Sequence, residues 1–135
     1  MTTKSMAYDH STYITRTGAA LGEAGGAGTT GYAKFVAFTS MLAFNAVLTI
    51  TGTGTTTAHT VSIQKISGTA TTAIGTATLG TSAVGVTTSI ALSTAAGGLA
   101  LAQGDILEVY TGSDAAGKVA VTYEVGVAPL ASVTA

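Results

Sequence analysis

A strict alternation near the carboxyl end of the chain constrains the fold more than any other feature. Over residues 118–127 every second residue is apolar, and the alternating set is Val119, Val121, Tyr123, Val125 and Val127. A period of two is typical of a β-strand that buries one face. The preceding run, 99–110, places Leu107 and Val109 on one face, and a Gly-containing loop over 111–117 joins the two runs. The pattern predicts two strands paired in a hairpin.

Similar short runs recur along the chain, with turn residues between them. Further strands are expected at 32–39, 42–50, 58–66, 71–79 and 84–92. In the first of these, Tyr32, Val36 and Phe38 are expected to share one face, and the Thr-rich run 71–79 is expected at a sheet edge. A short helix beginning at Thr39 or Ser40 is the alternative for the second run. Seven or eight short strands at near-regular spacing predict an all-β, antiparallel β-sandwich or jelly roll.

The first 31 residues lack sustained periodicity and are rich in Gly and Ala from residue 18 onward. Without a packed apolar face, such a segment cannot offset the entropy lost on ordering. We therefore expect an extended N-terminal arm at 1–31, a β-domain at 32–129 and a C-terminal tail at 130–135. A disordered tail is the alternative for the arm, and deletion of 1–28 is expected to leave the domain folded. The residues through which the arm would bind a partner are Tyr8, Tyr13, Ile14, Arg16 and Leu21.

The chain carries very little charge. Charged residues make up 8% of the sequence and the net charge is -1, whereas a soluble domain typically has about 25% charged residues. There is no basic field to hold nucleic acid, and the most apolar window, 41–50, is too short to cross a membrane. Because little charge repulsion keeps copies apart, we expect part of the surface to be buried against other chains. Among homo-oligomers, we favour a trimer. A monomer with a hydroxyl-rich surface is the alternative.

No group of residues has the spacing of a catalytic, cofactor or metal site. The Gly-rich segment 26–31 matches a dinucleotide-binding pattern, but irregular chain precedes it and a strand follows it. His10 reads as a polar residue of the arm and His59 as an exposed residue at a strand start, although copies of one histidine could bind an ion at a trimer axis. Glu108 and Glu124 are expected to be neighbours across the predicted hairpin. We predict no enzyme activity, no cofactor and no metal.

A resemblance begins at Leu99-x-Leu101-x-x-Gly104-Asp105-x-Leu107-x-Val109. This stretch is similar to the late strands of jelly-roll domains in the broad C1q/tumour-necrosis-factor-like group. The Thr/Gly/Ala-rich sequence around it, over about residues 58–127, resembles the capsid decoration (cement) proteins of tailed bacteriophages. The resemblance implies a structural virion protein that is made in the host cytoplasm, binds the major capsid protein and stabilises the head. A receptor-binding or fibre-type β module of a phage tail or bacterial surface is the alternative.

Overall fold

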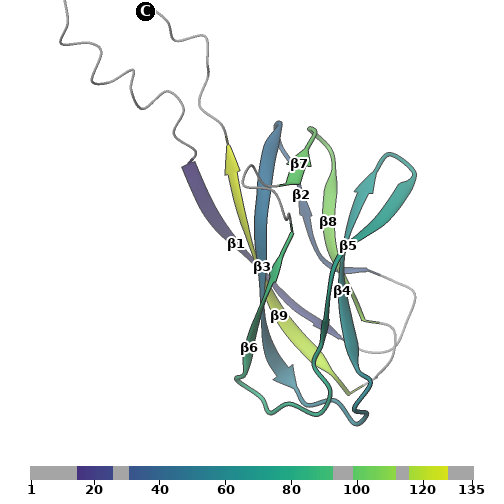
Figure 1. The fold of residues 1–135 in the computed structure, drawn as a ribbon. Coiled ribbons are helices and arrows are strands. Elements are labelled where there is room, and N and C mark those ends of the chain that lie inside the picture. Colours follow the sequence, from purple (N-terminus) through teal and green to yellow (C-terminus); the bar gives the residue numbers. More distant parts are fainter. Residues whose placement is uncertain (1–14, 26–30, 93–98, 112–115, 128–135) are drawn as a thin grey trace, which may run out of the picture.

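The computed structural model describes residues 15–25, 31–92, 99–111 and 116–127, and every regular element in these ranges is a β-strand. The strands are β1 (Thr15–Gly25), β2 (Tyr32–Val36), β3 (Met41–Gly52), β4 (Thr60–Ser67), β5 (Ala70–Thr78), β6 (Thr87–Ala91), β7 (Leu99–Leu101), β8 (Ile106–Thr111) and β9 (Lys118–Val127). The alternative of a short helix from Thr39 or Ser40 is wrong, because this segment bends directly into β3 (Figure 1).

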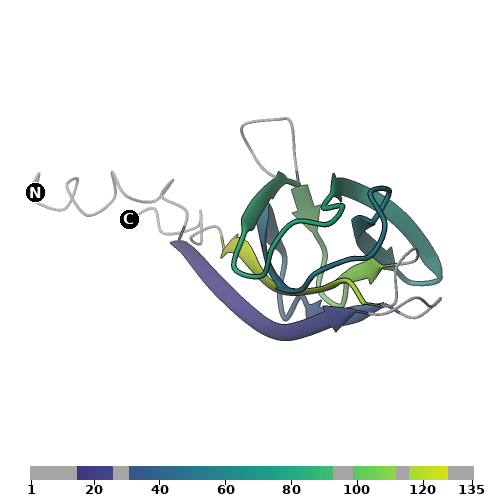
Figure 2. The ribbon, with the colours of Figure 1, turned by 90° about the horizontal axis from the view of Figure 1, so that it is seen from below.

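Two antiparallel sheets make up the fold. One has the order β1-β9-β3-β6, with the three-residue β7 also pairing with β3, and the other has the order β2-β8-β4-β5. Seen from below, the two sheets enclose a common interior (Figure 2). The chain crosses between the sheets at most connections, and the strand order is that of a jelly roll. The predicted antiparallel β-sandwich is confirmed.

The core lies between the inner faces of the two sheets. Its most deeply buried side chains come from β3, β4, β8 and β9, and include Ala46, Leu48, Val61, Ile63, Leu107, Val109, Val119, Val121, Tyr123 and Val125. The predicted alternation in 118–127 is confirmed, because the apolar residues from Val119 to Val125 are at most 1% exposed while Lys118 is exposed. Removal of this apolar surface from water is the main force that holds the sheets together.

The predicted hairpin between the last two strands is wrong. β8 pairs with β2 and β4, whereas β9 pairs with β1 and β3 in the other sheet. Glu108 therefore lies opposite Gln64, and Glu124 lies opposite Asn45, so the two glutamates are not cross-strand neighbours. Both strands have one apolar face, and these faces meet across the core. Alternation shows which face of a strand is buried, but it does not select the neighbour in the sheet.

Part of the predicted arm belongs to the sandwich. β1 pairs with β9 from Thr15 opposite Val127 to Gly25 opposite Lys118, so it forms the outer strand of its sheet. Backbone pairing needs no side-chain periodicity, which is why a Gly/Ala-rich strand escaped detection. The boundary expected between 31 and 32 therefore does not mark the start of the sheet structure, and removal of 1–28 would delete an entire strand. The tail at 130–135 lies outside the described residues.

A bulge in β2 reverses the faces that the sequence predicted. The pairing of β2 with β8 shifts between Tyr32 and Phe35, and Ala33 has a positive φ of 51°. A bulge adds one residue to a strand, so the residues beyond it exchange faces. As a result Val36 and Phe38 do not share a face with Tyr32: Tyr32 packs against the core, whereas Val36 and Phe38 are 53% and 68% exposed. Ala37 is buried in their place.

Candidate functional site at one end of the sandwich

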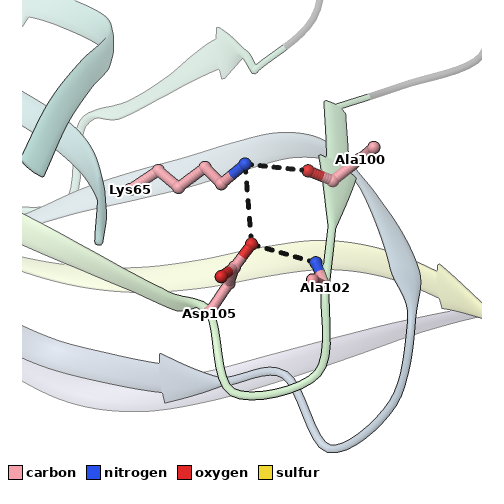
Figure 3. A network of polar contacts seen from close by, with 4 residues as sticks. All are labelled: Lys65, Ala100, Ala102 and Asp105. Atoms are coloured by element: carbon pink, nitrogen blue, oxygen red, sulfur yellow. Dashed lines mark hydrogen bonds and ion pairs between the residues drawn. The ribbon is translucent and has the colours of Figure 1, made fainter. Parts of the chain in front are cut away.

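A polar network closes the core at one end of the sandwich (Figure 3). Lys65 of β4 lies opposite the buried Leu107, so its side chain starts on the inner face of the sheet. Its ammonium group donates to the carbonyl oxygen of Ala100 at 3.1 Å and lies 3.5 Å from Oδ2 of Asp105. The same carboxylate oxygen accepts a hydrogen bond of 2.9 Å from the backbone N–H of Ala102. Because Ala100 belongs to β7, the network links the two sheets.

Asp105 braces the turn that precedes β8. The backbone N–H of Ala102, then the Ser67 side chain and the charge of Lys65 hold the pKa of the Asp105 carboxyl below 3.8. Gly104 has a φ of +91°, which a residue with a side chain rarely adopts. The Gly-Asp pair at the centre of the jelly-roll resemblance therefore makes a tight turn here. An aspartate that stays ionised at neutral pH is not equipped to donate a proton, and its contacts are those of a structural brace.

Replacement of Asp105 by asparagine is expected to change the acid response of the fold. A carboxylate whose pKa is lowered on folding stabilises the protein above pH 3.8, and this contribution is lost as the pH falls through the folded-state value. Asp105→Asn should therefore have a lower melting temperature than the wild type at pH 7, and the difference should shrink below pH 3.8. Thermal unfolding followed by circular dichroism from pH 7 to pH 2.5 measures this. Glu124→Gln is the control, and equal pH profiles for the two variants would contradict the assignment.

Glu108 is a second buried carboxylate. It lies on the outer face of the sheet β2-β8-β4-β5. It is 5% exposed, and its Oε2 lies 3.7 Å from the ammonium group of Lys34. Gly31 lies directly against this carboxylate, and a Cβ at that position would overlap it. Burial, with a smaller effect of the Glu108 charge, raises the pKa of the Tyr123 phenol. Asp105 and Glu108 are thus buried beside lysines, and they add little free charge to the surface.

His59 is not the exposed residue that the sequence predicted. It is 1% exposed and its ring packs against Gly117. Neither ring nitrogen has a hydrogen-bond partner in the described part of the chain. Backbone N–H groups of Leu79 and Gly80 donate to its carbonyl oxygen, so the residues that follow β5 are bound to the backbone of His59. A histidine so enclosed cannot meet its copies at a symmetry axis.

Apolar surface is exposed at the same end as the polar network. A depression of about 420 Å³ is lined by Ser40, Met41, Leu42, Ala100, Leu101 and Ala102. Phe38 precedes this lining by two residues and is 68% exposed. We call Phe38 and the depression together the end surface. The end surface could not be predicted from the sequence, because the bulge at Ala33 that turns Phe38 outward has no sequence signal such as Gly or Pro.

The predicted arm meets the sandwich at this end as well. Arg16 lies opposite Gly126, which also lies opposite Leu42 in the lining of the depression. Two strand spacings, roughly 10 Å, therefore separate the backbone of Arg16 from the depression. Leu21 lies within β1, at a register shift between Ala20 and Glu23. The other three predicted partner-binding residues, Tyr8, Tyr13 and Ile14, lie outside the described residues.

Comparisons of the chain with protein-family models, with curated proteins and with solved structures give no match. Within the described ranges, no three His, Cys, Asp or Glu side chains lie close enough together to hold a metal ion. The same ranges contain no helix that is long and apolar enough to cross a membrane. The end surface is therefore interpreted from its own geometry.

Proposed function

We propose that this chain is a structural virion protein, a capsid decoration (cement) protein. It binds the major capsid protein on the outside of the head, after synthesis in the host cytoplasm, and stabilises the shell. It acts as a homo-oligomer, with a trimer as the favoured state. It uses no catalytic residue and no cofactor.

The observation that carries the proposal is the convergence of three features at one end of the sandwich. The exposed Phe38 and the apolar depression lie there, and β1 begins there at Thr15. Residues 1–14, which include Tyr8, Tyr13 and Ile14, precede this strand in the sequence. Such a cluster of aromatic and aliphatic contacts fits attachment to another protein surface better than it fits chemistry on a small substrate.

The low surface charge supports the same interpretation. The chain has only 11 charged residues: five are Lys or Arg and six are Asp or Glu. Two of the carboxylates, Asp105 and Glu108, are buried beside lysines. The seven residues 67–73 around the β4–β5 turn are all exposed and all uncharged. Copies that crowd together on a shell tolerate this surface because they repel one another only weakly.

The test uses heads from the virus that encodes this chain and heads from a mutant virus in which the gene is deleted. Purified protein is mixed with the heads that lack it, and binding is measured by co-sedimentation through a density gradient. We expect saturable binding and a higher temperature of DNA release from decorated heads. Deletion of residues 1–14, which leaves every described strand in place, should weaken binding without lowering the melting temperature of the free protein. Absence of the protein from wild-type heads would overturn the proposal.

A receptor-binding or fibre-type module is the second candidate, and the apolar depression is the observation that favours it. A hollow of 420 Å³ is within the range of small-molecule sites, roughly 300–1,000 Å³. In that case the protein would co-purify with tails instead of heads, and it would bind intact host cells. Fractionation of disrupted particles into heads and tails separates the two candidates.

A further inference from the structure

We propose that the two parts of the end surface bind each other between copies, so that the Phe38 side chain of one copy occupies the depression of a second copy. The inference rests on the homo-oligomer in the proposed function and names the contact that holds it together. Within the described part of the chain, the exposed Phe38 side chain and the apolar depression are complementary in character.

Phe38 has the properties of an interface anchor. At 68% it is the most exposed of the large apolar side chains in the described ranges, and the others in that group are valines. Aromatic side chains are enriched in the cores of protein interfaces because they bury a large area with few rotatable bonds. Its exposure also means that Phe38 does not fill the depression of its own copy. A second molecule is needed to cover it.

The depression selects an apolar occupant. Five of its six lining residues are apolar, and Ser40 at the rim is the exception. Lys65 and Asp105, which contact the backbone of the lining residues Ala100 and Ala102, are also paired with each other. A charged side chain would lose its hydration in this hollow and find no counter-charge. The uncharged Phe side chain has no such hydration to lose when it enters the hollow.

The placement of the two features favours a closed assembly of identical copies. Phe38 and Ser40 are separated by one residue, so the projecting side chain and the hollow lie at the same end of the molecule. A self-complementary patch of this kind forms a reciprocal or cyclic contact, whereas complementary patches at opposite ends would build an open filament. With a net charge of -1 the copies repel one another only weakly.

The expected contact is small. A buried Phe covers roughly 150–250 Å², so insertion of one Phe38 side chain per contact, with the surrounding rim, stays below about 1,000 Å², the lower limit of a stable specific interface. The oligomer should therefore dissociate on dilution in the micromolar range. Assembly on a repeating shell would raise the local concentration of copies and favour the same contact.

The first experiment is light scattering coupled to size exclusion, on the full chain at several concentrations. We expect the wild type to run as a concentration-dependent oligomer and Phe38→Ser to have an at least tenfold higher dissociation constant. Val84→Ser is the matched control, because Val84 is 62% exposed at the opposite end of β3 and should leave association unchanged. Ala100 is exposed and lines the hollow, so Ala100→Arg places a long charged side chain at its entrance and should weaken association as Phe38→Ser does. A monomeric wild type, or an oligomer insensitive to Phe38→Ser, would overturn the inference.

The absence of cysteine makes a direct proximity test possible. The single variants Thr39→Cys, which keeps Phe38, and Ala100→Cys are mixed and oxidised, and the cross-linked heterodimer is measured by mass spectrometry. It should form faster than the product of Thr39→Cys with Val84→Cys, and equal rates would contradict the contact. The two proposals fail separately. If the wild type decorates heads but its oligomer is insensitive to Phe38→Ser, the inference fails alone, and if the oligomer depends on Phe38 but binds no heads, the proposed function fails alone.

Discussion

Replacement of Tyr123 by alanine is expected to lower the free energy of unfolding by about 4 kcal/mol, as large aromatic-to-alanine changes in a packed core do. Tyr123 is fully buried, on β9 of one sheet. Its ring lies 6.3 Å from that of Phe35 in β2, and its hydroxyl donates to the carbonyl oxygen of Ala33 at 3.1 Å. The side chain therefore spans the core and holds the bulged segment of β2. Stabilities of small domains are roughly 5–15 kcal/mol, so the loss is a large fraction of the total.

Urea unfolding followed by circular dichroism measures this loss. Tyr123→Phe is the matched control, since it keeps the ring and removes only the hydrogen bond to Ala33, at a cost of about 1 kcal/mol. A Tyr123→Ala variant that is no less stable than Tyr123→Phe would show that the ring does not connect the two sheets. Because β2 leads into Phe38, Tyr123→Ala should also weaken self-association if the variant remains folded.

Replacement of Gly117 by alanine is expected to cost about 3 kcal/mol, at the upper end of the usual penalty for overpacking. A Cβ at this position would lie 2.7 Å from Cε1 and 2.8 Å from Cδ2 of the His59 ring. His59 is buried, and its backbone is held by hydrogen bonds to Thr56, Leu79 and Gly80. The ring therefore has little room to move away. Here the glycine is needed for close approach, and its φ is not in the left-handed region.

Thermal and urea unfolding of two variants check this explanation. Gly18→Ala is the control, because a Cβ there meets Thr122 at an ordinary 3.5 Å and should change stability little. The double variant His59→Ala/Gly117→Ala should be more stable than the sum of the single changes predicts, because removal of the ring makes room for the methyl group. Strict additivity would mean that the clash with His59 is not the cause of the loss.

Several features of the fold were predictable because they depend on local patterns. The alternation in 118–127 identified the buried face of β9, and the placement of Leu107 and Val109 on one face identified that of β8. The edge position of the Thr-rich strand β5 is also confirmed. In each case the side-chain period of two, set by the geometry of extended backbone, appears directly in the order of residues.

The features that escaped prediction depend on contacts between distant residues. The burial of His59 follows from the position of Gly117, and the burial of Glu108 follows from Gly31 and Lys34. The outward turn of Phe38 follows from the bulge in β2. No window of sequence contains both partners of the His59 or Glu108 contact, so the residues read alone as exposed and polar.

The sequence by itself indicated an all-β fold of packed sheets, because short strands with one apolar face must bury that face against other strands. It also determined that the surface carries little charge. Only the tertiary structure decided which strands are neighbours, since two strands with equally apolar faces satisfy burial whether they pair in one sheet or pack across the core. That choice, together with one bulge, brings Phe38, the apolar depression and the start of β1 to a single end of the molecule.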